Sequence, residues 1–380
     1  SVACVNKYAS VMPYPFSRFN PKDGSISSLD RFSETNVSDA SFELVRNATF
    51  IVFDQNRGLQ ILGQFPSLEL MFTVPADLVH EAPVYVPPPM NAIILSALHA
   101  GVIPQLIINL NASVPTIANF TSDPPVYAVN GGRYFNGTVF WAVGGGFPFQ
   151  ASNGSIILQT PGIFALDPMT RKVTTLLNNY YGAQFNSPDD LAVDANGDIY
   201  FTDPWYGWGL NLTTNPILAP ATWRFRPSTG SANIIETSLV QPNGVGISPD
   251  GRTLYVTDTG ATVFNTPPDI IPRYTYNSTG PRLTYAFDVT TFSAGGYLTN
   301  KRPIWLAEEV ADDGFHVAGN GYLVGAAGFG VDILSPYGEL LIRIQTEFFV
   351  NNIQFAGADY KELWLFGQGG ISRVTWNLQG

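Results

Sequence analysis

The sequence of 380 residues contains little cysteine and little charge, and each shortage excludes a class of structure. Its single cysteine, Cys4, rules out an internal disulfide, so a large apolar core has to stabilise the fold. Only 13% of the residues are charged, about half the usual share, whereas 45% are apolar. We therefore expect an ordered globular protein, in which Cys4 is a terminal thiol without a special role.

Basic residues are scarce as well. The 19 Lys and Arg residues are outnumbered by 30 Asp and Glu residues, which gives a formal net charge of −11. Nucleic acids and anionic membranes both bind to basic surfaces, so we expect neither as a partner. One apolar run, residues 92–110, resembles a membrane span, but His99, Pro104 and Gln105 interrupt it. We interpret it as two buried strands joined by a turn, with His99 in the core.

Familiar catalytic motifs are missing. The sequence contains no GxSxG, HExxH, CxxC or phosphate-binding P-loop pattern. The glycine-rich stretches at 144–147 and 325–330 follow no strand-to-helix pattern, and we interpret them as strand ends and turns. Any active site therefore has to use another arrangement of residues than these motifs.

Sustained helical periodicity is missing too. Apolar residues do not follow the 3.6-residue period of a helix for more than a turn or two. Instead, 36 Gly and 29 Pro residues interrupt the chain at short intervals, with aromatic and β-branched residues between them. This pattern predicts an all-β fold.

One short pattern recurs six times along the chain. Residues 187–203, SPDDLAVDANGDIYFTD, and residues 241–258, QPNGVGISPDGRTLYVTD, each combine a polar pair, an alternating strand, a glycine turn, a second apolar strand and Thr-Asp. Every copy carries a polar residue, here called the anchor, at the same point: Glu81, Asn130, Asp189, Asn243, Asp313 and Asn352. Successive anchors lie 49, 59, 54, 70 and 39 residues apart. Repeats of about 50 residues with several short strands predict a six-bladed β-propeller.

The anchors predict a metal site in the central channel of that propeller. Because the innermost strand of each blade lines the channel, the anchors form one polar ring, and none of them is Lys or Arg. Carboxylates held close together repel one another unless a cation lies between them. Ligands that are all oxygen favour Ca²⁺ over Zn²⁺, and the ring offers Glu81, Asp189, Asn243 and Asp313. Alternatively, each anchor caps a strand or forms an Asx turn.

Eight glycosylation sequons indicate the compartment. Asn-x-Ser/Thr sites are modified in proteins that pass through the secretory pathway, so their number favours a secreted, N-glycosylated protein. The sequons are Asn36, Asn47, Asn111, Asn119, Asn136, Asn153, Asn211 and Asn277. The opening residues, SVACVNKYAS, show neither a basic start nor an apolar leader, as expected if a signal peptide has been removed.

These segments resemble the SMP-30/gluconolactonase family of six-bladed propellers, and most closely the secreted fungal lactonohydrolases within it. The resemblance is carried by residues 174–207, TTLLNNYYGAQFNSPDDLAVDANGDIYFTDPWYG, by residues 241–260, QPNGVGISPDGRTLYVTDTG, and by HEAPVYVP, PSLEL and NIQFAG. It extends from about residue 42 to the C-terminus. It implies a metal-dependent hydrolase that opens a lactone.

The resemblance also implies metal ligands. The ligands of the family match Glu81, Asn243 and Asp313, while the third-blade ligand, usually Asn, is Asp189 here. This extra negative charge should strengthen cation binding but weaken the cation as a Lewis acid, unless Asp189 is protonated or acts as a base. We expect one Ca²⁺ in the channel, with a second, structural ion as a further option.

Four more side chains are candidates for the substrate pocket. Asn130 and Asn352 are the two anchors that the metal does not use. Trp205 and Tyr206 follow the third repeat, in a loop similar to one of the family. The alternative for the two aromatic residues is packing at the rim of the propeller.

Catalytic groups are expected close to the metal. His80 precedes a ligand directly, and His316 follows Asp313 by three residues, so either histidine is a candidate general base or substrate contact. Simple packing is the alternative for both. Asp189 and Asp313 are the other catalytic candidates.

We expect a single domain, with residues 1–75 as an N-terminal arm and residues 76–380 as the propeller. The strand-like segment ATFIVFDQ of the arm is expected to help close the ring. The predicted function is that of a secreted, calcium-dependent lactone hydrolase, in which the metal polarises the carbonyl and water attacks. A phosphotriesterase-like hydrolase and a calcium-stabilised binding protein without turnover are the alternatives.

Overall fold

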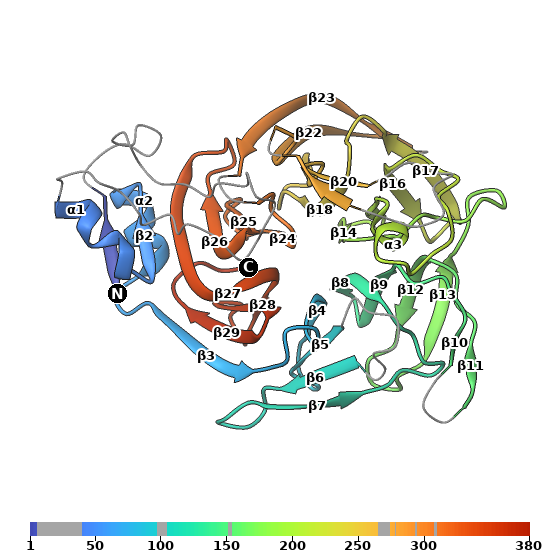
Figure 1. Ribbon diagram of the computed structural model, residues 1–380, viewed down its shortest axis with the longest axis horizontal. Coiled ribbons are helices and arrows are strands. Elements are labelled where there is room, and N and C mark those ends of the chain that lie inside the picture. Colours follow the sequence, from blue (N-terminus) through green and yellow to red (C-terminus); the bar gives the residue numbers. More distant parts are fainter. Residues whose placement is uncertain are drawn as a thin grey trace.

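The computed structural model describes residues 1–5, 40–96, 105–150, 154–264, 274–277, 279–292, 295–307 and 310–380. Antiparallel sheets surround a common centre, and the described helices are short (Figure 1). The predicted all-β class is confirmed.

Four sheets each consist of four strands in an antiparallel meander. The first contains β4 (Glu81–Val86), β5 (Ala92–Ser96), β6 (Gln105–Asn109) and β7 (Thr116–Phe120). The second contains β8 (Val129–Phe135), β9 (Thr138–Val143), β12 (Gly162–Leu166) and β13 (Val173–Leu177). The third contains β14 (Leu191–Val193), β15 (Ile199–Asp203), β16 (Ala221–Arg226) and β17 (Ser231–Glu236). The fourth contains β18 (Pro242–Ile247), β19 (Thr253–Asp258), β22 (Leu283–Phe292) and β23 (Gly295–Leu306). Two small hairpins pair β10 (Phe149–Gln150) with β11 (Ile156–Ile157) and β20 (Thr262–Phe264) with β21 (Tyr274–Tyr276).

A larger sheet of nine strands joins both ends of the chain. Its main path is β24 (Phe315–Val317), β25 (Leu323–Ala326), β26 (Gly328–Leu334), β27 (Leu340–Ala356), β28 (Glu362–Gln368), β29 (Gly370–Thr375) and β3 (Ser67–Thr73). The long strand β27 pairs with β26 through its first half and with β28 through its second half. Because β3 pairs with β29, a strand from the N-terminal region completes a sheet made of C-terminal strands (Figure 1).

The N-terminal region contains a helix that the sequence analysis missed. Within ATFIVFDQ only β2 (Phe50–Val52) is a strand; it pairs with β27, and β1 (Val2–Cys4) pairs with β2. Asp54 then caps α2 (Gln55–Leu62), accepting a hydrogen bond of 2.9 Å from the backbone N–H of Arg57. The helix α1 (Ala40–Glu43) and a 3₁₀ turn (Val45–Asn47) lie between β1 and β2 in the chain.

The sheets pack face to face, so their central strands are buried on both sides. Every residue of β5 and β15 is buried, which explains why the sequence shows short apolar runs there in place of strict alternation. Trp141 of the second sheet shares a hydrophobic cluster with Val84 of the first. Trp364 of the nine-stranded sheet shares another with Ile93 of the first, so packing continues across the junction of the chain ends.

Six strands line the centre, and we call them the inner strands: β4, β8, β14, β18, β24 and the part of β27 from residue 351 to 356. Each contacts the next in this order, and β27 contacts β4. The structure confirms two strands within residues 92–110, β5 and β6, whereas His99 lies outside the described residues. No helix in the described ranges is long and apolar enough to cross a membrane.

Candidate active site

The anchors all lie where an inner strand begins. Glu81 opens β4, and Asn130 and Asn243 are the second residues of β8 and β18. Asn352 follows a register shift in β27 and pairs with Phe366 of β28. Asp189 and Asp313 each lie two residues before their strands. The sequence pattern therefore brings these six residues, the anchor ring, to one end of the channel.

Glycines after the anchors allow the inner strands to approach closely. A Cβ atom on Gly131 would lie 2.3 Å from the carbonyl oxygen of Asp189, and one on Gly244 would lie 2.4 Å from that of Asp313. Neither glycine has a positive φ. The glycines that follow Asn130 and Asn243 thus allow neighbouring strands to pack closely around the channel. A role in a turn would not require this close contact.

Amide side chains hold two of the predicted ligands. Asn352 Nδ2 donates a hydrogen bond of 2.7 Å to Glu81 Oε2. Asn351 Nδ2 donates one of 3.3 Å to Asp313 Oδ2, and Asn243 also bonds the Asp313 side chain. These contacts join residues that are up to 271 positions apart in the sequence.

The charge at the ring is negative and poorly compensated. Burial raises the pKa of Glu81, and the carboxylate of Asp313 raises it further. Burial likewise raises the pKa of Asp189, assisted by Glu81 and Asp313. Asp189 Oδ2 is buried without a hydrogen-bond partner among the described residues, and so are both side-chain atoms of Asn130.

This chemistry fits a hard divalent cation. Buried carboxylate and amide oxygens that lack partners are the donors that Ca²⁺ prefers. No three His, Cys, Asp or Glu side chains in the described part of the chain form a compact metal-binding cluster, however. The fit therefore rests on the donor types and the unpaired oxygens, with the amide of Asn243 as one member of the set.

His80 lies beside the ring. Its Nδ1 is 3.0 Å from Glu81 Oε1, although the two atoms are not aligned as a hydrogen bond. Desolvation lowers the pKa of His80, and the carboxylate of Asp313 opposes that shift. The side chain is 31% exposed, so it remains accessible to a small molecule at this end of the channel.

Of the two aromatic candidates, Tyr206 reaches the ring. It begins the short helix α3 (Tyr206–Gly209), and its hydroxyl is hydrogen-bonded to Thr259. Burial raises the pKa of Tyr206, and the carboxylate of Asp189 raises it further, whereas Asn243 lowers it. The indole Nε1 of Trp205 instead donates a hydrogen bond of 3.0 Å to the carbonyl of Leu218. Trp205 therefore packs in its loop while Tyr206 faces the predicted ligands.

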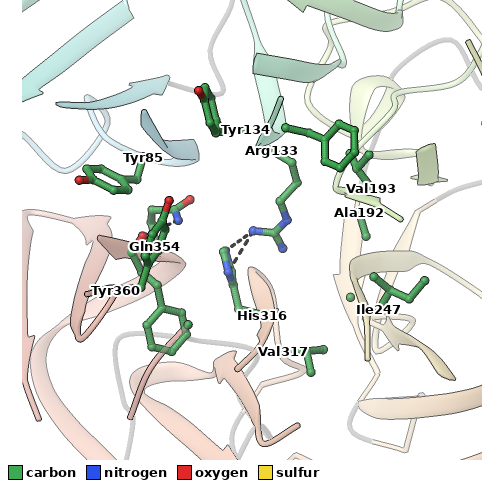
Figure 2. Close-up of a pocket in the computed structure, with 14 residues that line it drawn as sticks. Tyr85, Arg133, Tyr134, Ala192, Val193, Ile247, His316, Val317, Gln354 and Tyr360 are labelled. Carbon is green, nitrogen blue, oxygen red and sulfur yellow. Dashed lines mark hydrogen bonds between the residues drawn. The ribbon is translucent and has the colours of Figure 1, made fainter. Parts of the chain in front are cut away.

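His316 lies further along the channel, in a pocket of about 230 Å³ at the other end of the inner strands. We call it the distal pocket, and Tyr85, Arg133, Tyr134, His316, Gln354 and Tyr360 are among its lining residues. Figure 2 shows Arg133 extending from β8 toward His316 on β24. The guanidinium bonds both the His316 ring and the carbonyl of Phe315, the latter at 2.8 Å.

The polar groups of the distal pocket are largely satisfied within the protein. Burial raises the pKa of Asp190, and the charge of Arg133 opposes this shift. Asp190 Oδ2 also accepts a hydrogen bond of 3.1 Å from the backbone N–H of Val245. Burial and the nearby charge of Arg133 lower the pKa of His316 well below its usual range. The structure thus separates His316 from the anchor ring.

Sequence reasoning missed Arg133, Asn351 and Asp190 as parts of the channel. A signal for Arg133 exists, because it follows its anchor by three residues, as His316 does. The same phase in two repeats predicts the same depth in the channel. Asn351 has no such signal beyond its position next to an anchor.

Comparison with known proteins shows the relationship. Residues 134–366 match the SMP-30/Gluconolactonase/LRE-like region. The chain belongs to this family, as the sequence predicted. Lactonohydrolase oryL of Aspergillus oryzae (strain ATCC 42149 / RIB 40) is 42% identical over 386 residues, covering 100% of this chain and 86% of the relative. Lactonohydrolase oryH of the same organism is 38% identical, with 100% and 91% covered.

Solved structures support the fold. The gluconolactonase XC5397 from Xanthomonas campestris superimposes with a TM-score of 0.66 at 21% identity, over 86% of this chain and 94% of that one. Regucalcin from Agrobacterium tumefaciens, a calcium-binding protein, gives a TM-score of 0.56 at 14% identity, over 83% and 95%.

Proposed function

We propose that this chain is a calcium-dependent lactonase whose reaction takes place at the anchor ring. Full-length similarity to two lactonohydrolases supports the hydrolysis of a lactone. The observation that carries the calcium proposal is the buried Oδ2 of Asp189, which has no partner among the described residues. The charges that act on Asp189 all belong to carboxylates, so an added cation relieves their repulsion.

The same proposal includes six blades. The four meander sheets supply four of them, β24 to β27 a fifth, and β27 to β29 with β3 a sixth. The unbroken order of contacts among the inner strands supports this arrangement, as does one anchor per inner strand.

The ligands in this proposal are Glu81, Asp189, Asn243 and Asp313. A bound divalent cation supplies a Lewis acid that polarises the lactone carbonyl and stabilises the charge that develops on its oxygen. The chain's own residues prepare the site, because Asn352 orients Glu81 and the neighbouring Asn351 orients the carboxylate of Asp313.

His80 is the better candidate for the general base. It lies at the ring and is partly exposed, so it can take a proton from a water that attacks the carbonyl. His316 is bound by Arg133 at the other end of the inner strands. Asp189→Asn tests the remaining choice: turnover survives if Asp189 is only a ligand and is abolished if Asp189 is the base.

The substrate in this proposal is a small lactone. The side chain of Asn130 is buried and its amide atoms have no partner among the described residues, so it can donate one hydrogen bond and accept another. Tyr206 offers a hydroxyl near the ring, where it is hydrogen-bonded to Thr259. Carbonyl, ring oxygen and hydroxyl groups of a lactone match such partners.

A substrate panel tests the proposed function. Aldonolactones, aliphatic lactones, aryl esters and a phosphotriester are offered to the chelated protein with and without added Ca²⁺. We expect lactone opening that depends on Ca²⁺. Phosphotriester turnover in its place would favour the phosphotriesterase alternative, and Ca²⁺ binding without any turnover would favour a binding protein.

We further propose that the protein is secreted and N-glycosylated. The six sequon asparagines in the described ranges are exposed, which supports their modification: Asn47, Asn111, Asn119, Asn136, Asn211 and Asn277. Asn36 and Asn153 lie outside those ranges. Protein from a eukaryotic secreting host should lose mass on treatment with an N-glycosidase, and an unchanged mass would contradict the proposal.

A further inference from the structure

Thr202 connects two neighbouring predicted ligands. It lies at the end of β15, fully buried. Its Oγ1 accepts a hydrogen bond of 3.1 Å from the backbone N–H of Asp190 and donates one of 2.6 Å to the backbone carbonyl of Asn243. Its own carbonyl accepts a bond of 2.9 Å from the N–H of Asp189. One threonine therefore fixes the backbone at a ligand of the third sheet and at one of the fourth.

Asp203, the next residue, holds the segment that leads to Asp189. Its two carboxylate oxygens accept hydrogen bonds from the backbone N–H groups of Asn186, at 3.0 Å, and Ser187, at 2.7 Å. Asp203 is fully buried. Asp203 thus holds the loop that precedes Asp189, and the carbonyl of Thr202 holds the backbone of Asp189 itself.

The fourth sheet repeats this device. Thr257 Oγ1 accepts a hydrogen bond of 2.8 Å from the N–H of Gly244, the residue after Asn243. Asp258 accepts bonds from the N–H groups of Val240, at 3.0 Å, and Gln241, at 2.9 Å. The same pair of residue types thus makes equivalent bonds in two sheets.

We propose that the two Thr-Asp pairs, Thr202–Asp203 and Thr257–Asp258, are positioning residues that set the affinity of the anchor ring for its cation. The inference rests on the proposed function, because it assumes that Asp189 and Asn243 are ligands. Neither pair contributes a ligand itself. Each acts through the backbone, which places the carboxylate of Asp189 and the amide of Asn243 toward the channel.

The physical reason lies in the repulsion at the ring. Asp189 is buried near Glu81 and Asp313, so its loop is under electrostatic pressure to move away from them. Bonds from Thr202 and Asp203 hold the loop in place before a cation arrives. Outer partners that orient metal ligands in this way typically change metal affinity by about 10- to 100-fold when they are removed.

The matched pair Thr202→Val and Thr222→Val tests the inference. Thr222 is the cross-strand neighbour of Thr202 in the third sheet, is equally buried, and its hydroxyl has no partner among the described residues. We expect Thr202→Val to weaken Ca²⁺ binding about 10- to 100-fold by calorimetry. Thr222→Val should bind like the wild type, and Thr202→Ser should restore the affinity.

A second matched pair separates positioning from stability. Asp194 is buried in the same sheet and accepts hydrogen bonds from the backbone N–H groups of Asn196, at 2.8 Å, and Asp198, at 3.0 Å, in the hairpin turn far from the ring. Melting curves in chelator measure how far Asp194→Asn and Asp203→Asn each change the stability of the fold. Only Asp203→Asn should also weaken Ca²⁺ binding.

The outcomes distinguish the two levels of the proposal. If wild-type protein binds no Ca²⁺, the proposed function fails. If the wild type binds Ca²⁺ and Thr202→Val and Asp203→Asn bind it as tightly as their controls, the positioning inference is overturned while the proposed function stands. A variant that does not fold is recognised by its melting curve in chelator, and Thr202→Ser then supplies the test, since a tenfold loss there would contradict a role of the hydroxyl.

Discussion

The two ends of the channel are built from the same inner strands, yet they handle buried charge in opposite ways. At the anchor ring, Asp189 faces other carboxylates and keeps one oxygen without a partner among the described residues. In the distal pocket, Arg133 is bonded to His316 and Phe315. Burial raises the pKa of Asp190, and the charge of Arg133 lowers it. Asp190 itself adds to the rise that burial causes in the pKa of Asp189, but of these two adjacent aspartates only Asp190 has its own pKa lowered by a cationic side chain of the described residues.

This contrast teaches where an external cation is needed. A buried carboxylate is stable only when paired or protonated. Asp190 receives its positive charge from the chain, whereas Asp189 does not, so a cation from solution has its place at the ring. The second, structural ion considered for the channel stays a prediction. The positive charge that acts on Asp190 is the guanidinium of Arg133.

The largest expected effect comes from removing a neutral or charged ligand at the ring. Asn243→Ala and Asp313→Ala should both abolish lactone opening, because each takes away a donor to the ion that stabilises the developing charge. Initial rates measured at saturating Ca²⁺ check this. Turnover near the wild-type rate in either variant would show that the ring is not the reaction centre.

The two histidines provide the next contrast between the ends. His80→Gln should lower kcat by roughly 10²- to 10⁴-fold, the usual contribution of general acid–base catalysis. His316→Gln, at the distal end, should leave kcat within about threefold of the wild type once folding is confirmed, because it removes no general base. If His316→Gln lowered kcat and His80→Gln did not, the general base would lie at the distal end of the channel and the assignment to His80 would be wrong.

Arg133→Met probes the distal end alone. It leaves the buried carbonyl of Phe315 and the His316 ring without their donor, and an unsatisfied buried acceptor costs about 1–3 kcal/mol of unfolding free energy. Urea unfolding should show this loss both in chelator and in Ca²⁺. If lactone turnover of the folded variant fell as far as in Asn243→Ala, the two ends would not be separate.

The smallest effect is a dependence of stability on pH. Burial raises the pKa of Asp203 from 3.8 to about 7, so between these values the folded protein holds a proton that the unfolded chain has lost. This contribution to stability is present below pH 3.8 and disappears as the pH rises through about 7. The melting temperature of chelated protein should therefore fall between pH 5 and pH 8, and Asp203→Asn should reduce the fall. An equal fall in the variant would exclude Asp203 as its source.

The repeats explain why so much of the fold was predictable. One anchor per repeat and a Gly turn between apolar strands are local signals, so the sheets and the positions of the anchors followed from the sequence. The helix α2 was missed because its N-cap, Asp54, directly follows an apolar segment that is typical of a strand. Short apolar segments do not distinguish the two structures by period alone.

The positions of the candidate ligands followed from the repeats, whereas their hydrogen-bond partners did not. Asn352 was proposed as a substrate contact, and nothing in the sequence indicated that its amide also donates to Glu81. His316 was expected near the metal from its distance to Asp313 in sequence, yet in a strand three residues span about 10 Å along the channel. Contacts such as that of Arg133 with His316 join different sheets. A single amino-acid sequence carries no direct record of such contacts.

The central claim is that one cation at the anchor ring makes the protein a catalyst. The direct measurement is a Ca²⁺ titration of chelated protein in which bound ion and initial rate of lactone opening are followed together. We predict that activity rises in step with binding and is complete at one ion per chain. Full activity in the chelated protein, or complete binding without activity on any lactone, would contradict the claim.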